Sequence, residues 1–287
     1  MTIWRKVAFI FFGFLSLSTI SLFFFARSLT GSGVLTISFL NIGQGDAIYI
    51  EAPNGKQIIV DGGPGPVVLS ELGKVMPLFD RTIDAIIVTN PDKDHIAGFI
   101  DIMKRYKVDY IVLPGTVSTT ITYNSVESFV KEKGLEKILA RRGMDIVLDK
   151  ENEVYLHILF PDRDVSNFTT NDGSIVAKLI YGKTSILLEG DASQKIENYL
   201  LAFDKTELDS DILKTGHHGS RTSTAQAYVE AASPDYAIIS SGIDNKYGHP
   251  HKETLETLAK FNVPVLRTDT DGRITFVSDG NNFIRTE

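Results

Sequence analysis

Histidines and carboxylates of this chain gather in a few short segments. The stretch IIVTNPDKDHIAG places Asn90, Asp92, Asp94 and His95 within six residues, directly after an apolar run of strand length. Oxygen and imidazole donors that meet at the end of a strand form a ligand set for a divalent metal ion. A solvated turn that caps a helix explains this segment equally well when it is taken alone. His157, by contrast, lies inside the alternating run VYLHILF, which indicates a structural role.

Three later segments add donors of the same kind. Asp191 follows the apolar run SILLEG, where capping of the next helix is the alternative role. GHHG sets His217 and His218 between two glycines, which permit tight backbone turns. YGHPH adds His249 and, beyond a proline, His251, which is alternatively a surface residue at a helix start. Donors from four separated segments are the inventory of a hydrolytic site for one or two divalent ions, so they favour a metal hydrolase.

Composition removes several other kinds of protein. The 287-residue chain contains no cysteine, so disulfides, thiolate zinc sites and thiol nucleophiles are excluded. It carries 29 Lys and Arg against 36 Asp and Glu, which gives a net charge of −7. A chain this acidic lacks the broad basic field of a protein that coats DNA without specificity. Any contact with a nucleic acid must therefore be local.

The elements that must position these residues follow from hydropathy. Apolar runs of strand length recur between turn signals in both halves of the chain, with helical patterns between them. The predicted strands cover residues 35–40, 47–50, 57–60, 85–88, 110–113, 154–160, 175–180, 185–188, 236–239, 265–268 and 274–277. The predicted helices cover residues 66–79, 96–106, 125–142, 192–203, 225–232 and 252–261. This distribution predicts an α/β fold in which two sheets pack together and helices cover both outer faces.

The N-terminal segment predicts a membrane anchor. Residues 7–26 form a run of 20 uncharged residues, which as a helix spans the roughly 30 Å hydrocarbon core of a bilayer. A cleaved signal peptide and a buried core helix are the alternatives, but the run ends in FFFA, where signal peptidase needs small residues at two positions. We therefore divide the chain into an uncleaved anchor with its linker, residues 1–30, and a hydrolase domain, residues 31–287.

Flanking charges predict the orientation of this anchor. Arg5 and Lys6 precede the apolar run together with the terminal amine, and only Arg27 follows it closely. Positive charge favours the cytoplasmic side of a membrane. We therefore expect a single-pass protein of the cell membrane, with its N-terminus in the cytoplasm and its hydrolase domain outside.

Six short motifs, in this order along the chain, resemble the metallo-β-lactamase superfamily. They are GQGDA at 43–47, VDGG at 60–63, NPDKDH at 90–95, EGD at 189–191, GHHGS at 216–220 and YGHP at 247–250. The sequence is most similar to the hydrolase domain of ComEC-type DNA-uptake (competence) channels and their standalone relatives, over about residues 35–277. This resemblance implies an αββα sandwich with the metal site at one edge of the paired sheets.

The resemblance also implies roles for individual residues. It places metal ligands at Asp92, Asp94 and His95, a carboxylate that bridges two metal ions at Asp191, and a loop histidine that completes the second metal site at His217. The expected cofactor is one or two divalent ions, with zinc or manganese favoured and magnesium also suitable.

The reaction implied by the resemblance is attack on a phosphodiester by a metal-bound water. Asp94 orients that water or binds metal beside it. His218 and His249 resemble further site histidines that bind metal, substrate phosphate or the leaving group. They are also the candidates to donate a proton to the leaving oxygen, a step that requires the imidazolium form.

One position departs from the pattern of the family. The first metal motif usually opens with His, and Asn90 stands there in this chain. A neutral carbonyl oxygen binds transition metals less well than imidazole does, so the first metal site would be weakened or biased toward Mn²⁺ or Mg²⁺. The alternative is that Asn90 only hydrogen-bonds its own loop.

Other residues near the motifs have both a site role and a plain structural one. Asp61 of VDGG supports the metal shell or caps a turn. The glycines of GQGDA form a tight turn between two strands rather than a phosphate cradle, and we expect Asp46 near the site. Lys214, Ser220 and Arg221 flank the two adjacent histidines and are candidates to hold a substrate phosphate, with ordinary surface polarity as the alternative.

Asn171 lies in a segment that resembles one near the family's substrate. It is a further candidate substrate contact, or part of a plain turn.

Three functions are compatible with the sequence. The first function is a membrane-anchored, extracytoplasmic phosphodiesterase or nuclease that acts on DNA. The second is a hydrolase of the same fold that cleaves a small ester, lactone, lactam or nucleotide. The third, suggested by Asn90, is a catalytically weak accessory module of a separate membrane channel protein that takes up DNA.

Overall fold

Runs of aliphatic and β-branched residues fold into two mixed β-sheets. The computed structural model describes residues 3–30 and 32–286, without the side chains of residues 3, 7–8 and 20–30. In spatial order, the first sheet contains β15 (Phe283–Arg285), β14 (Ile274–Ser278), β1 (Leu35–Phe39), β2 (Ala47–Glu51), β3 (Gln57–Gly62), β4 (Thr82–Ile87), β5 (Lys107–Leu113) and β6 (Glu136–Leu139). The second sheet contains β13 (Val265–Arg267), β12 (Tyr236–Ile239), β11 (Ile212–Lys214), β10 (Thr184–Leu188), β9 (Val176–Tyr181), β8 (Val154–Phe160) and β7 (Asp145–Asp149).

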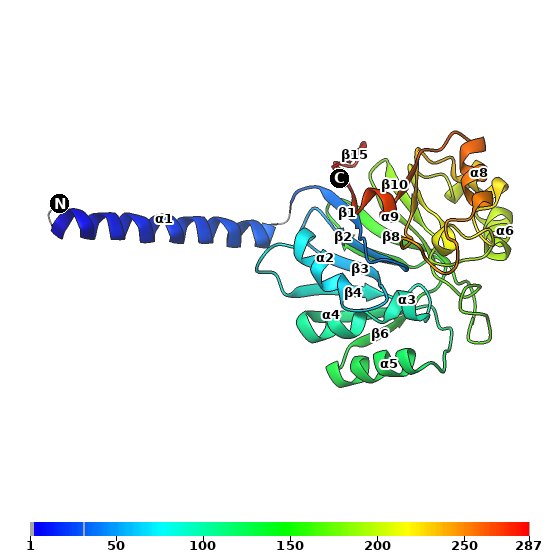
Figure 1. The fold of residues 1–287 in the computed structure, drawn as a ribbon, viewed down its shortest axis with the longest axis horizontal. Helices are drawn as coiled ribbons and strands as arrows, with labels where there is room; N and C mark the ends of the chain where they lie inside the picture. Colours follow the sequence, from blue (N-terminus) through cyan, green and yellow to red (C-terminus); the bar gives the residue numbers. More distant parts are fainter. Residues whose placement is uncertain (1–2, 31, 287) are drawn as a thin grey trace.

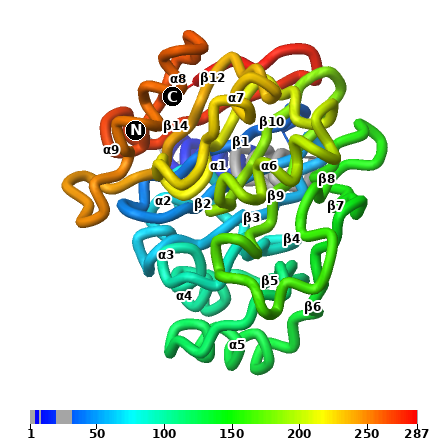
Figure 2. Tube along the Cα trace, turned by 90° about the vertical axis from the view of Figure 1, so that its right-hand side faces the viewer, coloured from blue at the N-terminus to red at the C-terminus, as the bar shows by residue number. Residues whose placement is uncertain are grey.

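Helices cover the outer faces of both sheets (Figures 1 and 2). The first sheet packs against α2 (Val67–Val75), α4 (Phe99–Arg105) and α5 (Ile121–Lys133). The second sheet packs against α6 (Gln194–Phe203), α7 (Gln226–Ala232) and α8 (Lys252–Lys260). A third apolar cluster, which includes Ile37, Val60, Leu156 and Ile186, fills the space between the sheets. The αββα sandwich expected from the sequence is confirmed.

The helix predicted at residues 125–142 is wrong in its second half. Thr120 starts α5 by accepting a hydrogen bond from the Tyr123 amide through its side chain. The helix ends at Lys133 because Gly134 adopts a left-handed φ of 68°, a conformation that glycine tolerates better than other residues. The chain then forms β6, which pairs in parallel with β5. Strands β6, β7 and β15 are absent from the sequence prediction, because their exposed polar residues mask the strand pattern. Strand β11, which has only three residues, is absent from it as well.

The predicted membrane segment, residues 7–26, lies within helix α1 (Ile3–Thr30), which projects from the sheets in Figure 1. The side chains of residues 7–8 and 20–26 of this segment lie outside the described residues. Within the part of the chain that the structure describes, no helix meets the length and apolarity that crossing a membrane requires.

Parallel strands bring the polar segments to one edge of the sandwich. Strands β3, β4 and β5 run parallel in the first sheet, and β10, β11 and β12 run parallel in the second. The carboxyl ends of parallel strands lie at the same edge of a sheet. Asp61 is the second-last residue of β3, His95 follows β4, Asp191 follows β10 and His217 follows β11. Since His95 Nε2 lies 3.1 Å from Asp191 Oδ2, the two edges face each other.

A close backbone contact holds the segment after β4 against β3. A Cβ atom on Gly98 would lie 1.9 Å from the carbonyl oxygen of Gly62, the last residue of β3. Gly98 has an ordinary helical φ of −68°, so space rather than backbone conformation excludes a larger residue. This contact fixes the helix that carries His95 to the sheet that carries Asp61.

We predict opposite effects of alanine at two glycines. Gly98→Ala should lower the free energy of unfolding by about 1–3 kcal/mol, because the methyl group forces the two backbones apart. Gly73→Ala is the matched control, since it lies inside α2 with no neighbour within 4 Å of its added Cβ, and it should raise stability by about 0.5–1 kcal/mol. Denaturant unfolding of the full chain measures both, and an unchanged Gly98→Ala variant would contradict the packing argument.

Candidate metal centre

A short helix directly after β4 presents two of the predicted ligands. Pro91 and Asp92 lead into α3 (Lys93–Ile96), whose four residues include Asp94 and His95. His95 is fully buried, whereas the Asp94 side chain is 30% exposed. The helix therefore sends one donor into the interior and one toward solvent.

Two carboxylates hold the ring of His95 from opposite sides. Its Nδ1 lies 2.7 Å from Asp61 Oδ2, and its Nε2 lies 3.1 Å from Asp191 Oδ2. Asp61 also accepts hydrogen bonds from the amide and the hydroxyl of Thr89, at 2.8 and 2.6 Å. Asp61 accepts the Nδ1 proton of His95 in a hydrogen bond, so Nε2 faces Asp191 and is the ring atom available to a metal ion. Asp61 thus takes the supporting role that the sequence left open.

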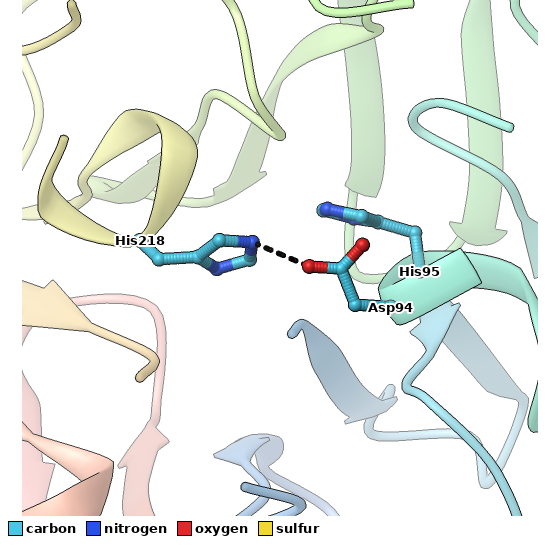
Figure 3. Close-up of side chains that lie close together, drawn as sticks. All are labelled: Asp94, His95 and His218. Carbon is cyan, nitrogen blue, oxygen red and sulfur yellow. Dashed lines mark ion pairs between the residues drawn. The ribbon is translucent and has the colours of Figure 1, made fainter. Parts of the chain in front are cut away.

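His218 approaches the same centre from the second sheet. Its Nε2 lies 3.4 Å from Asp94 Oδ2 and 3.6 Å from Asp191 Oδ1. Figure 3 shows the His218 ring pointing at the Asp94 carboxylate, with the His95 ring beside them. The other nitrogen, Nδ1, lies 3.1 Å from the carbonyl oxygen of Ser240 and donates to it. This bond fixes the ring so that Nε2 faces the centre.

The backbone of the GHHG segment is strained in order to aim its histidines. His217 and His218 lie in η2 (Gly216–Gly219) with φ values of 49° and 56°, in the left-handed region that side chains disfavour. The His217 amide donates to the Gly190 carbonyl at 3.0 Å, which ties this loop to the segment that carries Asp191. Contacts with the surrounding fold therefore offset the energetic cost of a backbone conformation that brings both rings to the sheet edge.

Several buried polar atoms at this centre point at one another. Among the described residues, His95 Nε2, His218 Nε2, Asp191 Oδ1 and Asp46 Oδ1 have no hydrogen-bond partner. Ligand atoms of Asp94, His95 and His218 lie within 4.8 Å of one another, and so do those of Asp46, His95 and Asp191. Buried polar atoms normally have partners, and nitrogen and oxygen donors of this kind suit a divalent cation. The residues present therefore fit the metal that the sequence implies.

Electrostatics at the centre favour positive charge. Burial lowers the pKa of both imidazoles, but the carboxylates outweigh it: Asp191 and Asp61 raise the pKa of His95 well above its usual value, and Asp191 and Asp46 raise that of His218 to about 9. Burial raises the pKa of Asp191, but the imidazoles outweigh that too and hold it well below its usual range. The cluster attracts a proton or a metal ion to the same place.

Lys214 and Asp46 form a buried ion pair behind the centre. Lys214 Nζ lies 2.8 Å from Asp46 Oδ2 and donates a second hydrogen bond to the Thr215 carbonyl at 3.0 Å. The Lys214 side chain is 1% exposed, so its ammonium faces Asp46 and not the surface where a substrate phosphate would arrive. Asp46 Oδ1 in turn lies 3.5 Å from His218 Nδ1. The pair supports the ring of His218 from behind.

Asn90 and Asp92 are engaged by their own surroundings. Asn90 is fully buried, and its Oδ1 accepts a hydrogen bond from the Asp92 amide at 2.9 Å. Asp92 Oδ2 accepts from the Thr170 hydroxyl at 2.9 Å. Asp92 belongs to neither group of converging ligand atoms. The contact of Asn90 favours the interpretation that this residue hydrogen-bonds its own loop.

The remaining predicted residues line the outer side of the centre. His217 Nε2 lies 4.0 Å from Asp191 Oδ2, and its Nδ1 lies 3.5 Å from Asn171 Nδ2, so Asn171 is near the site. The His249 ring is centred 5.4 Å from that of His217. Among the candidates for phosphate binding, Arg221 is exposed, and its guanidinium lies 3.9 Å from Glu253.

Ser220, Thr89 and Ser240 also lie close to the residues of the centre. Ser220 is buried, and its hydroxyl contacts that of Thr222 at 2.9 Å. Thr89 and Ser240 orient the two ligating histidines, yet the sequence interpretation does not include them. Thr89 directly precedes the NPDKDH motif, which is a local signal for it, whereas the carbonyl of Ser240 carries no signal in its residue type.

We predict that breaking the buried pair destabilises the chain. Lys214→Met leaves the Asp46 carboxylate buried and unpaired, so the free energy of unfolding should fall by about 3–5 kcal/mol. The double variant Lys214→Met with Asp46→Asn should recover most of this loss, because neither partner of the pair is then charged. Denaturant unfolding with a chelator present measures both. A single variant as stable as the unmodified chain would contradict the pairing.

We also predict that metal binding releases protons. At pH 7 the raised pKa values keep protons on His218 and His95, and a metal ion must displace them. Affinity for Mn²⁺ should therefore increase with pH, by about tenfold per unit for each proton released, and the contribution of His218 should end at about pH 9. Calorimetry of the full chain in buffers of different ionisation enthalpy counts these protons. His157→Ala, remote from the centre, should leave the count unchanged, and a count of zero for the unmodified chain would contradict the electrostatics.

Comparisons with known proteins agree with this site. Residues 40–243 match the family model described as the Metallo-beta-lactamase superfamily. ComE operon protein 3 of Bacillus subtilis is 30% identical over 257 residues, which cover 84% of this chain and 32% of that protein. Recombination protein 2 of Haemophilus influenzae is 30% identical over 250 residues, 85% of this chain and 29% of that protein. The chain spans about a third of the length of these curated relatives.

A solved structure has the same fold at low sequence identity. The metallo-beta-lactamase fold protein YhfI from Bacillus subtilis superimposes with a TM-score of 0.56 at 13% identity, over 85% of this chain and 100% of that one. Together with the family match and the competence-protein relatives, this agreement settles the classification. The chain belongs to the metallo-β-lactamase superfamily and has a metallo-β-lactamase fold of the ComEC type.

Proposed function

We propose that this chain is a metal-dependent phosphodiesterase that cleaves DNA. The observation that carries the proposal is the converging set of Asp94, His95, Asp191 and His218, which come from both halves of the sandwich and leave unpartnered donor atoms at one point. Relatives named for competence and recombination make a nucleic acid the best-supported substrate.

The four residues of the cluster would hold the ion through two imidazole nitrogens and two carboxylates. A divalent ion in such a site acts as a Lewis acid on the phosphoryl oxygen and lowers the pKa of a coordinated water. Mn²⁺, Zn²⁺ and Mg²⁺ all accept ligands of this kind, and the carboxylates raise the preference for the harder ions.

The residues of the chain itself position the reactants. Asp61 fixes the tautomer of His95, and the Ser240 carbonyl fixes that of His218. Asp94 is the cluster carboxylate with an exposed side, so it accepts a hydrogen bond from the attacking water and orients it.

His249 stabilises the leaving oxygen by a hydrogen bond rather than as a general acid. Burial and the neighbouring His218 and His217 lower the pKa of His249 to about 4, so its ring is neutral at pH 7. A neutral imidazole donates an N–H hydrogen bond but holds no extra proton. This changes the role in proton transfer that the sequence suggested for His249.

The proposal includes the setting of the reaction. The uncharged run at residues 7–26 would anchor the chain in the cell membrane, and the charges around it would keep the N-terminus in the cytoplasm and the hydrolase domain outside. DNA would then be cleaved on the outer side of the membrane. A separate membrane channel protein is the partner that this arrangement suggests.

Cleavage assays test the proposal. Full-length chain in detergent should hydrolyse single-stranded DNA, double-stranded DNA or bis(p-nitrophenyl) phosphate with Mn²⁺, Mg²⁺ or Zn²⁺. Asp94→Asn should lower kcat by about 10²–10⁴-fold, because the attacking water keeps only a neutral, weakly basic acceptor. Asp101→Asn, on the outer helix α4, is the matched control and should retain activity.

Two other outcomes would contradict the proposal. Hydrolysis of an ester, lactone or lactam without any phosphodiester cleavage would assign another hydrolase of the same fold. A folded chain that binds no metal and turns over no substrate would assign an accessory module without catalysis.

A further inference from the structure

A rigid surface loop borders the metal centre on the side of the second sheet. The loop at residues 240–251 connects β12 to α8, and it is the orange segment that projects at the left of Figure 2. Asn245 fixes it from inside: its Nδ2 donates to the carbonyls of Gly242 and His249, and its Oδ1 accepts from the amides of Tyr247 and His249. The Gly242 amide donates in turn to Gln44 Oε1 at 3.2 Å. Hydrogen bonds of Asn245 and Gln44 therefore hold the shape of the loop.

This ordered loop exposes apolar surface. The side chain of Tyr247 is 51% exposed and that of Ile243 is 73% exposed. An aromatic ring held at the surface by an ordered backbone contributes little to the core, and a binding role explains its position better. A rigid aromatic also binds with a small loss of conformational entropy.

Tyr247 is connected to the metal centre through ring contacts, one stacked and one edge-to-face. Its ring centroid lies 5.7 Å from that of His249, with an angle of 21° between the ring planes. The His249 ring lies 5.4 Å from that of His217, which faces Asp191. The His249 ring thus lies between the Tyr247 ring and the metal centre, so a group that stacks on Tyr247 would bind beside the centre.

Positive charge accompanies the exposed ring. Lys246 Nζ lies 4.9 Å from the centroid of the Tyr247 ring, and its side chain is exposed. Arg221 is exposed. It lies close to the loop, because its amide donates to His251 Nδ1 at 3.1 Å. In a chain with a net charge of −7, an aromatic face with adjoining cations is a local feature that suits a planar ring linked to a phosphate.

We propose that Tyr247 and Lys246 form a nucleotide subsite beside the metal centre, in which Tyr247 stacks on an unpaired base of a single strand and Lys246 contacts the neighbouring phosphate. A base inside a duplex is already stacked on both faces and cannot reach the ring, so the subsite selects single-stranded nucleic acid. The inference rests on the proposed function, because it describes where the substrate of that site binds.

Binding without metal tests the subsite separately from catalysis. Full-length chain with EDTA is titrated into a dye-labelled ten-residue oligothymidylate and into an abasic oligonucleotide of the same length, and fluorescence anisotropy gives both dissociation constants. Tyr247→Ala should weaken oligothymidylate binding about 5–150-fold, the equivalent of one lost base stack, and leave abasic binding within about twofold. Tyr247→Phe should retain affinity, and Tyr110→Ala, an exposed tyrosine on β5, is the matched control.

The remaining arms separate phosphate contact and substrate source. Lys246→Gln should weaken both oligonucleotides and reduce the salt dependence of binding by about one charge. Thymidine monophosphate should compete only at concentrations more than about 100-fold higher than the oligonucleotide, because it lacks the other contacts of a strand.

Three results would overturn the inference: unchanged binding of oligothymidylate to Tyr247→Ala, equal weakening of the abasic strand, or equal competition by the mononucleotide. A chain that binds oligothymidylate as expected but cleaves no phosphodiester would overturn the proposed function alone.

Discussion

The structure depends on a cluster of buried carboxylates. The protein's own positive groups neutralise their negative charge only in part. Asp61, Asp46 and Asp191 are each at most 3% exposed, and they lie around two imidazoles at the junction of the sheets. Removing a carboxylate from water costs several kcal/mol unless a partner compensates for it. Lys214 neutralises Asp46, while the rings of His95 and His218 partly neutralise the other carboxylates. The chain folds stably around this edge because a proton or a metal ion can supply the missing positive charge.

The two packed sheets keep these charged groups at a fixed separation. Each half of the sandwich contributes parallel strands whose carboxyl ends carry the ligands, and close-packed apolar clusters on both faces of each sheet prevent the edges from relaxing apart. The tight contact of Gly98 with Gly62 and the left-handed backbone of the two adjacent histidines are local expressions of the same requirement. Strain is tolerated where it aims a ligand.

The sequence predicted what local patterns encode, namely most strands, most helices, the sandwich and the segments that meet at the site. It could not predict contacts between distant residues. Lys214 was a candidate for substrate binding, but it pairs with Asp46, which lies 168 positions away, and no residue type reports such a contact. His217 and His218 are adjacent and have similar backbone angles; only the side-chain distances show that His218 points at Asp94 and Asp191. In the same way, the strand at 136–139 depends on pairing with β5 rather than on its own polar composition.

The central claim is that the charge cluster binds a divalent metal ion, and a diffraction experiment at the manganese absorption edge tests it most directly. Crystals of the full chain grown with Mn²⁺ should give an anomalous peak within about 2.0–2.3 Å of donor atoms from Asp94, His95, Asp191 and His218. The peak should disappear for His95→Ala. An anomalous peak elsewhere, or none in crystals that retain the unpartnered cluster, would contradict the account.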